Sequence, residues 1–249
     1  MKCLRITLVI IWKIWFYVLA FLCTVLIGPG VYILTYQKNE RLTYFFIRSW
    51  ACILFYGTGF SYSLSSTEKL NPGENYLLVS NHTSTIDILL MFVLHPKHPI
   101  IFVGKKELEK YPIFGRTYKK VSILVDRSDK KSREAVFPAI KKKLTKENKN
   151  VVLFPEGGVP DRDIILEKFK DGAFISAIYC NTPVVVYAFH NLKNMFPFVS
   201  TIGQPGKIKV ERLSVLYPEG ETKDSLREKV YTMIYDKIKN DKLKYPEIK

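Results

Sequence analysis

The stretch YLLVSNHTSTIDILL, residues 76–90, sets an apolar run, a short polar segment and a second apolar run next to one another. Residues 76–79 are apolar without interruption, as in a strand that is covered on both faces. Ile86, Leu89, Leu90 and Val93 follow at helical spacing, and residues 83–85 are all of the types that cap helix N-termini. The stretch therefore predicts a strand, a loop and a helix, which is the repeating unit of an α/β fold.

His82 lies in the predicted loop, and Asp87 lies in the first turn of the predicted helix. Five residues along a continuous helix turn through roughly 500°, so the two side chains can meet only if His82 precedes the helix. A carboxylate in the first turn is also favoured by the helix dipole. The segment predicts a general base with an orienting carboxylate. Since the spacing His-x4-Asp also arises by chance, it needs support from other segments.

The other three histidines have no aspartate five residues later. His95 and His98 lie among prolines and a lysine, which predicts an exposed turn. His190 follows a strand-like run and has no evident acidic partner nearby in the sequence. We expect structural roles for all three.

From about residue 61 onward, short β-rich runs alternate with helical segments, as is typical of an α/β domain. We expect strands at residues 60–64, 76–79, 100–103, 122–125, 150–154, 183–189 and 207–215. We expect helices at residues 84–94, 130–146 and 172–179, and near the C-terminus where Leu226, Val230, Ile234 and Ile238 recur. Pro138 should make the second helix less regular, and the charges that alternate with Ile208 and Val210 place the last strand nearer an edge. The predicted fold is a mixed, mainly parallel sheet covered by helices.

Residues 14–37 carry no charge and are mostly aliphatic and aromatic. At 1.5 Å per residue, a helix of this length can cross roughly 30 Å of hydrocarbon. Because Gly28, Pro29 and Gly30 interrupt the run, two half-length helices that dip into one leaflet are an alternative. Residues 44–60 form a second apolar stretch that fits a helix at the interface or one that returns along the first. We expect residues 1–60 to form membrane-associated helices and residues 61–249 to form the α/β domain, without a cleaved signal peptide.

The chain has a net charge of +15, with 38 Lys and Arg against 23 Asp and Glu in 249 residues. Such a surface attracts anionic lipid headgroups, at about 1 kcal/mol per well-placed residue. It would attract nucleic acid too, but no zinc-finger spacing, RNP-like motif or basic-region heptad is present, and we expect no nucleic-acid partner. The crowding of Lys and Arg in the domain predicts that the domain lies on the cytoplasmic face of a membrane.

The four cysteines are scattered, and three of them lie in apolar segments. This distribution favours a reducing compartment and argues against a disulfide scaffold. No Cys/His cluster occurs, so we expect no metal site.

Two further predicted strands end in polar or glycine-marked segments, where α/β folds place ligand-binding loops. Glu156 and Gly157 follow the apolar residues 151–153, and Arg127 follows the strand predicted at residues 122–125. An arginine there can bind phosphate through its bidentate fork. Each segment alone also fits an ordinary turn: Pro218, Glu219 and Gly220 repeat the tripeptide of residues 155–157 where we expect only a turn and a helix start.

Taken together and in this order, the segments resemble the glycerolipid acyltransferases of the 1-acylglycerol-3-phosphate acyltransferase family, over residues 76–186. The resemblance is carried by Asn81, His82 and Asp87 in an Asn-His-x4-Asp motif, by Lys105, Glu107 and Leu108, by Asp126 and Arg127, by Phe-Pro-Glu-Gly at residues 154–157, and by the apolar residues 183–185. Ordered motifs at sensible separations are a far stronger signal than one short spacing.

The resemblance implies transfer of a fatty acyl group to the sn-2 hydroxyl of 1-acylglycerol 3-phosphate, which gives phosphatidic acid in phospholipid biosynthesis. It implies acyl-CoA or acyl-acyl carrier protein as donor, a membrane lipid as acceptor, and neither a cofactor nor a metal. His82 and Asp87 would be catalytic, with backbone N–H groups around Ser84 receiving the developing negative charge. The implied substrate-binding residues are Asn81, Lys105, Arg127, Glu156 and Gly157. Direct transfer is favoured, although Ser80, Thr83 and Ser84 leave a covalent route open.

The sequence departs from the family after Gly157. Many members continue with Thr-Arg-Ser, whereas Gly158, Val159, Pro160, Asp161 and Arg162 follow here. Arg127 and Lys105 would then bind the acceptor phosphate, with Arg162 or Lys170 contributing. One alternative is a related acyltransferase with another lyso-lipid or an aminolipid as acceptor. A membrane-anchored binding protein without catalysis would explain the charge and the N-terminus but not the ordered motifs.

Overall fold

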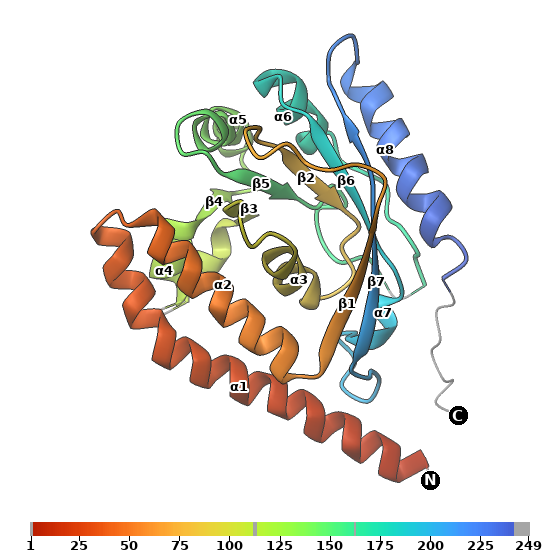
Figure 1. The fold of residues 1–249 in the computed structure, drawn as a ribbon. Helices are drawn as coiled ribbons and strands as arrows, with labels where there is room; N and C mark the ends of the chain where they lie inside the picture. Colours follow the sequence, from red (N-terminus) through yellow and green to blue (C-terminus); the bar gives the residue numbers. More distant parts are fainter. Residues whose placement is uncertain (1, 112–113, 162, 242–249) are drawn as a thin grey trace.

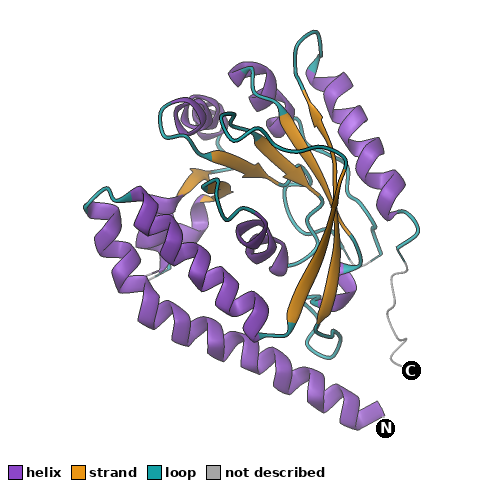
Figure 2. Cartoon of the chain, viewed as in Figure 1, coloured by secondary structure: helices purple, strands orange, loops and turns teal. Residues whose placement is uncertain are grey.

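The computed structural model describes residues 2–111, 114–161 and 163–241, and its centre is a seven-stranded sheet (Figures 1 and 2). The strands lie in the order β1-β7-β6-β2-β5-β3-β4. Their bounds are Phe60–Ser66 (β1), Leu77–Ser80 (β2), Ile100–Lys105 (β3), Ser122–Val125 (β4), Asn150–Leu153 (β5), Val184–Phe189 (β6) and Gly206–Leu216 (β7). All neighbours are parallel except β6 and β7. The predicted mixed, mainly parallel sheet is confirmed, and β7 lies one strand in from the β1 edge.

Helices cover both faces of the sheet, which explains why the central strands are apolar throughout. The helices α2 (Glu40–Gly57) and α3 (Ile86–Leu94) provide most of the helical residues of one buried cluster, and α5 (Lys130–Thr145), α6 (Gly172–Cys180) and α8 (Lys223–Ile238) contribute to the other. Figure 1 shows the two sets on opposite sides of the sheet. Pro138 lies inside α5 without ending it.

Three short elements were absent from the sequence prediction. They are the 3₁₀ helix Lys106–Lys110, α4 (Phe114–Val121) and α7 (Leu192–Met195). The first two lie between β3 and β4, and α7 follows β6 directly. Each is too short to show a helical period in the sequence.

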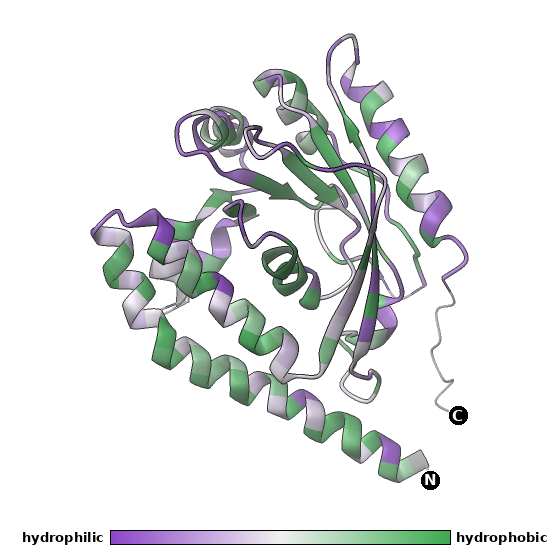
Figure 3. Ribbon diagram, viewed as in Figure 1, coloured by the Kyte–Doolittle hydropathy of each residue, from purple (hydrophilic) through white to green (hydrophobic). Residues whose placement is uncertain are grey.

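The N-terminal helix α1 runs without a break from Lys2 to Tyr36. The alternative of two half-length helices is therefore wrong: Pro29 is accommodated inside the helix, whose C-terminal part bends in Figure 1. Within the described residues, Cys3–Tyr36 is the one helical segment long and apolar enough to cross a bilayer by length and composition. Figure 3 shows that apolar residues dominate most of its length.

Instead of projecting from the domain, α1 lies along it and packs against α2 (Figure 1). The buried ammonium of Lys13 donates to the carbonyls of Pro197 and Val199 at 2.6 and 2.5 Å. The indole N–H of Trp12 donates to the Thr58 carbonyl just beyond α2 at 2.8 Å, and that of Trp15 donates to the Gly57 carbonyl at the end of α2 at 3.0 Å. Polar contacts therefore fix the N-terminal half of α1 to the α/β domain.

His95 corrects one sequence prediction, because it lies buried at the end of α3 rather than in an exposed turn. Its ring nitrogens are 2.9 Å from the Met91 carbonyl and 3.1 Å from the Tyr187 hydroxyl. Burial lowers the pKa of His95 to about 4, so the ring is neutral at ordinary pH. Its structural role is as expected, but its surroundings are not.

Candidate active site

The loop between β2 and α3 brings His82 and Asp87 together, as the sequence predicts. His82 Nδ1 lies 2.9 Å from Asp87 Oδ2. The Asp87 side chain is fully buried, and the same oxygen accepts the Ser84 N–H at 2.9 Å and the Thr83 N–H. Because this carboxylate only accepts, Nδ1 of a neutral His82 carries the proton and Nε2 keeps its lone pair. The arrangement leaves a base at Nε2.

The same hydrogen bonds narrow one expectation about the helix start. Backbone N–H groups around Ser84 are expected to receive negative charge from the reaction, but those of Thr83 and Ser84 donate to Asp87. They therefore hold the carboxylate in place and stabilise its charge.

The imidazole ring of His82 is fixed by stacking as well as by hydrogen bonding. Its centroid lies 4.1 Å from that of Phe154, at an interplanar angle of 13°. The His82 side chain keeps 17% of its surface exposed, which allows a substrate to reach it. Phe154 follows β5, so neighbouring strands β2 and β5 place the two rings face to face.

Glu156 lies directly behind this loop and is only 3% exposed. One carboxyl oxygen accepts the backbone N–H of His82 at 2.5 Å, and the other accepts that of Glu167 at 2.9 Å. Burial raises the pKa of Glu156 to about 8, although both N–H groups favour the charged form. The carboxyl therefore ties the His82 backbone to the loop after β5, while a contact with substrate stays a prediction.

Asn81 and Ser84 tie the same loop to β6 and α7. The Asn81 side chain donates to the Phe189 carbonyl at 3.0 Å and accepts the Phe189 N–H at 2.9 Å. The Ser84 hydroxyl donates to the Phe196 carbonyl at 2.8 Å. Since both side chains are buried and engaged with backbone, the structure gives them a positioning role, and the expected contact between Asn81 and substrate stays a prediction.

A cavity of about 530 Å³ begins at His82 and extends between the helices that cover this face. Its polar end includes His82, Lys105, Arg127 and Gly157. Its remaining walls are mainly apolar, and they come from α1, α2, α3, β3 and α4. They include Ile27, Val31, Ile47, Trp50, Ile88, Leu89, Phe92 and Phe102. The base therefore faces a space suited to a long apolar chain.

Cationic groups gather at the polar end of this cavity. Lys105 ends β3, and the guanidinium of Arg127 donates to the carbonyl of Gly157. Gly157 has φ +77°, and a Cβ there would lie 2.7 Å from the ammonium of Lys170. The structure thus brings four sequence-predicted residues close to one another: His82, Lys105, Arg127 and Gly157. Arg162 lies outside the described residues.

Lys193 is a buried cation that the sequence did not reveal. It is 6% exposed, and its ammonium donates to the carbonyls of Asp161 and Ile164, the latter at 2.6 Å. Burial lowers the pKa of Lys193, and the nearby Glu156 carboxyl partly offsets this effect. Because α7 is only four residues long and Lys193 contacts a segment about thirty residues away, no local sequence signal points to it.

Among the described residues, no group of three or more His, Cys, Asp or Glu side chains is placed to hold a metal ion.

Comparison with known proteins adds three findings. A family model described as acyltransferase matches residues 62–190. The chain is 35% identical over 130 residues to a 1-acyl-sn-glycerol-3-phosphate acyltransferase of Helicobacter pylori, covering 51% of this chain and 52% of that protein. It is 23% identical over 185 residues to the human 1-acyl-sn-glycerol-3-phosphate acyltransferase beta, covering 74% and 65%. The match thus spans about half to two thirds of the length of these relatives.

The fold is similar to that of a solved structure, the 1-acyl-sn-glycerophosphate acyltransferase from Thermotoga maritima. The TM-score is 0.78, and the match covers 99% of this chain and 100% of the other. At 19% sequence identity, this likeness shows the fold alone.

Proposed function

This chain belongs to the acyltransferase family, and from that premise we propose that it transfers a fatty acyl group from an acyl thioester to the free sn-2 hydroxyl of 1-acylglycerol 3-phosphate. The observation that carries the proposal is the His82–Asp87 pair at the polar end of a long apolar cavity. An oriented base is what an alcohol nucleophile needs, and the cavity offers an apolar site for a fatty chain.

In the proposed mechanism, His82 Nε2 takes the proton of the acceptor hydroxyl as its oxygen attacks the thioester carbonyl. Asp87 holds the tautomer and stabilises the imidazolium that forms. The thiolate then leaves and can take the proton from the imidazolium, so the base returns to its neutral form. Direct transfer is supported by the hydroxyls of Thr83 and Ser84, which point to Asp87 and the Phe196 carbonyl rather than to the reaction.

The cations at the cavity mouth support an acceptor that carries phosphate. Lys105 and Arg127 line the cavity beside His82, and Lys170 lies against Gly157. The Lys170 backbone N–H is bonded to the Pro155 carbonyl at 2.8 Å, which fixes this residue next to the turn. We propose that these three cations bind the acceptor phosphate in place of the arginine that many family members carry after the Gly-Thr pair.

The exposed face of α1 supports a position at the membrane surface. It carries a row of apolar side chains: Leu4, Leu8, Ile11, Trp15, Val18, Leu22, Val25 and Leu26. Because the N-terminal half of the helix is bonded to the domain through Lys13, the helix cannot cross a bilayer without drawing the domain in with it. We propose that residues 1–60 rest in one leaflet and that residues 61–249 carry out the transfer on the cytoplasmic side.

A panel of acceptors tests the proposal directly. The purified chain in mixed micelles would be given 1-acylglycerol 3-phosphate, a zwitterionic lysophospholipid or a lyso-aminolipid, each with acyl-CoA and with acyl-acyl carrier protein. We expect the fastest turnover with the phosphate acceptor, because Lys105 and Arg127 line the cavity and Lys170 lies against Gly157. Faster turnover with an aminolipid would favour the second candidate, an acyltransferase with another acceptor, which the altered sequence after Gly157 suggests.

His82→Ala tests the base in the same assay. We expect at least a hundredfold loss of turnover, the usual order for a general base. His98→Ala is the matched control, because His98 lies in the loop before β3 and does not line the cavity that begins at His82, and we expect it to keep normal turnover. Retention of more than about a tenth of the activity by His82→Ala would remove this residue from the mechanism.

A further inference from the structure

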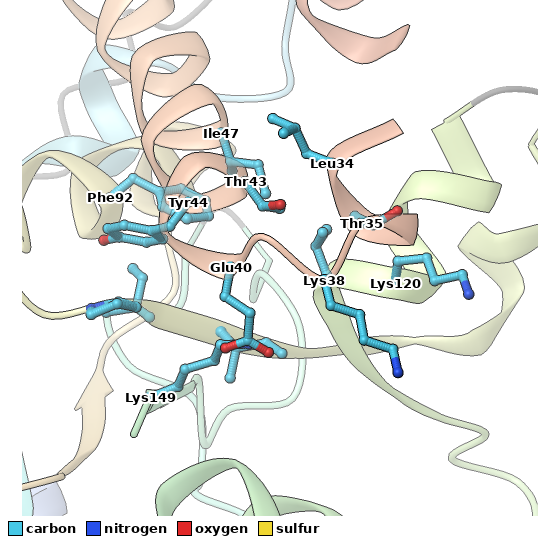
Figure 4. A pocket seen from close by; sticks show the side chains of 14 residues that line it. Leu34, Thr35, Lys38, Glu40, Thr43, Tyr44, Ile47, Phe92, Lys120 and Lys149 are labelled. Carbon is cyan, nitrogen blue, oxygen red and sulfur yellow. The ribbon is translucent and has the colours of Figure 1, made fainter. Parts of the chain in front are cut away.

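A second cavity, of about 180 Å³, lies where α1 turns into α2 (Figure 4). Its walls come from the end of α1, the start of α2, the start of β3 and the end of α4. None of the residues proposed to act on substrate lines it. It is therefore separate from the cavity that begins at His82, although Ile47, Phe92 and Val121 line both.

Three lysines from separate segments line this second cavity. Lys38 lies in the turn after α1, Lys120 lies on α4, and Lys149 lies just before β5. In Figure 4, Lys38 and Lys120 extend to the same side of the pocket, whereas Lys149 points toward Glu40. Glu40 is the single carboxylate among the described lining residues, so cations exceed anions there by two.

Lys38 and Lys120 differ from Lys149 in how their charges are compensated. The ammonium of Lys149 lies 3.1 Å from Glu40 and 2.9 Å from Glu147, so its charge is compensated. Lys120 lies over the ring of Tyr36, with its ammonium 4.9 Å from the ring centroid. Lys38 has φ +55° and makes no ion pair within the described part of the chain. An anion between Lys38 and Lys120 would therefore meet two charges that have no carboxylate partner among the described residues.

Apolar side chains form part of the wall of the cavity and surround it. Leu34, Ile47, Phe92 and Ile100 line it, and exposed apolar side chains lie around the α1–α2 turn. These are Ile33, Tyr36, Leu42 and Phe45. Cations beside exposed aromatic and aliphatic groups are the arrangement found at the headgroup level of a bilayer. A free phosphate would contact the cations alone, whereas a phospholipid would contact both the cations and the apolar side chains.

We propose that this cavity binds the phosphate headgroup of an anionic phospholipid, at a site distinct from the acceptor site. Lys38 and Lys120 would hold the phosphate, and the apolar walls would contact the glycerol and the first carbons of a chain. Such a lipid would anchor the α1–α2 turn at headgroup level, next to the helices that form the wall of the larger cavity. The proposal depends on membrane contact but not on acyl transfer.

The test uses the full chain in detergent and a short-chain, water-soluble phosphatidylglycerol as probe, with phosphorus NMR as readout and no acyl donor present. The test variant is Lys38→Gln with Lys120→Gln. The control, Lys130→Gln with Lys131→Gln at two exposed positions of α5, removes the same charge. At about 1 kcal/mol per lysine, we expect at least a tenfold loss of affinity in the test variant and less than about a twofold loss in the control.

Two further arms identify the ligand and its location. Inorganic phosphate should bind at least about tenfold more weakly than the lipid, since it gains nothing from the apolar walls. Lys105→Gln with Arg127→Gln removes two of the cations proposed to bind phosphate in the other cavity. In that background, Lys38→Gln with Lys120→Gln should still lower the affinity for the lipid at least tenfold. Equal losses in the test and control variants, binding of phosphate as tight as that of lipid, or no loss on adding Lys38→Gln and Lys120→Gln to the Lys105 and Arg127 variant would each overturn the proposal. Acyl transfer is scored separately, so failure of one proposal does not imply failure of the other.

Discussion

Asp87 determines the chemistry of His82 because its carboxylate can only accept hydrogen bonds. Three donors converge on one of its oxygens: the imidazole Nδ1–H and the N–H groups of Thr83 and Ser84. The proton on Nδ1 leaves Nε2 as the acceptor that faces the cavity. A pair of residues five apart thus becomes a directed base, because the first lies in a loop and the second in a helix.

Asp87→Asn should separate the role of charge from that of shape. An amide oxygen in the place of Oδ2 would still accept all three donors, and its NH₂ would face the Thr83 hydroxyl, so the imidazole keeps its proton on Nδ1. The variant loses only the negative charge that stabilises the imidazolium. We expect turnover to fall by about 10²-fold, with a smaller change in KM. Initial-rate kinetics would measure this, and thermal unfolding would check the fold. Normal turnover in a folded Asp87→Asn protein would show that the charge of Asp87 does not matter.

Glu156 makes a testable contribution to the pH dependence of stability. Its pKa of about 8 in the folded protein lies above the ordinary value of 4.5. Between these values the unfolded chain releases the proton while the folded protein keeps it, so stability falls as pH rises from about 5 to 8. The Glu156→Gln variant has no carboxyl group to titrate at this position. Because its NH₂ would face a backbone N–H, we expect its free energy of unfolding at low pH to be lower than that of wild type by about 1–3 kcal/mol.

The unfolding midpoint in detergent measures this effect across the same pH range. We expect the difference between wild type and Glu156→Gln to be largest near pH 5 and to shrink toward pH 8. Glu219→Gln is a matched control, since exposed Glu219 lies in an identical Pro-Glu-Gly tripeptide. A difference that stays constant with pH would contradict the assigned cause.

The two Pro-Glu-Gly tripeptides show how far residue-level prediction can reach. Gly157 and Gly220 have φ +77° and +74°, so the tripeptide does give a turn in both places. Glu156 is buried between two N–H donors and Glu219 is exposed, which the tripeptide cannot indicate. The same limit applies to His190, whose ring nitrogens lie 3.1 Å from Glu211 and from Asp241. Such partners come from distant segments and are invisible in local sequence.

At the scale of elements, all seven strands were predictable: continuous apolar runs mark the central strands, which are covered on both faces, and alternation of charged with apolar residues marks β7. α4 and α7 were not, because four to eight residues do not establish a helical period. α7 nevertheless matters for the site: Lys193 lies on it and holds the carbonyls of Asp161 and Ile164, and the Phe196 carbonyl beyond it accepts the Ser84 hydroxyl. Tertiary contacts, rather than helical propensity, stabilise this element.

The apolar row on α1 belongs to this scale as well. Leu22 and Leu26 are adjacent on its exposed face, at 46% and 79% exposure. Leu22→Lys with Leu26→Lys should weaken binding to phosphatidylcholine vesicles at least tenfold, because two apolar contacts with the interface are replaced by solvated charges. Sedimentation with vesicles would measure this. Tyr217→Lys, at the end of β7 that lies far from α1 in Figure 1, should bind as wild type. Equal binding by all three proteins would exclude α1 as the membrane contact.

For the whole molecule, the sequence allowed α1 either to cross the membrane or to rest in one leaflet. The length of an uncharged segment cannot decide between these two arrangements, because it reflects composition and does not show the surface against which the helix packs. The structure adds the contacts of Trp12, Lys13 and Trp15 with the domain, all within the segment that is long enough to span. We therefore expect the N-terminus to lie on the same side of the membrane as the α/β domain.

Cys3 provides the test of that arrangement because it is exposed near the start of α1. In a variant with Cys23, Cys52 and Cys180 each changed to serine, Cys3 should react with a membrane-impermeant maleimide in sealed vesicles that carry the domain outside. Lys130→Cys, on exposed α5 in a background that lacks all four native cysteines, reports the side on which the domain lies. We expect both positions to react before the vesicles are opened. If position 130 reacts at once and Cys3 only after detergent is added, α1 crosses the bilayer, and the contacts of Lys13 with the domain must break in the membrane.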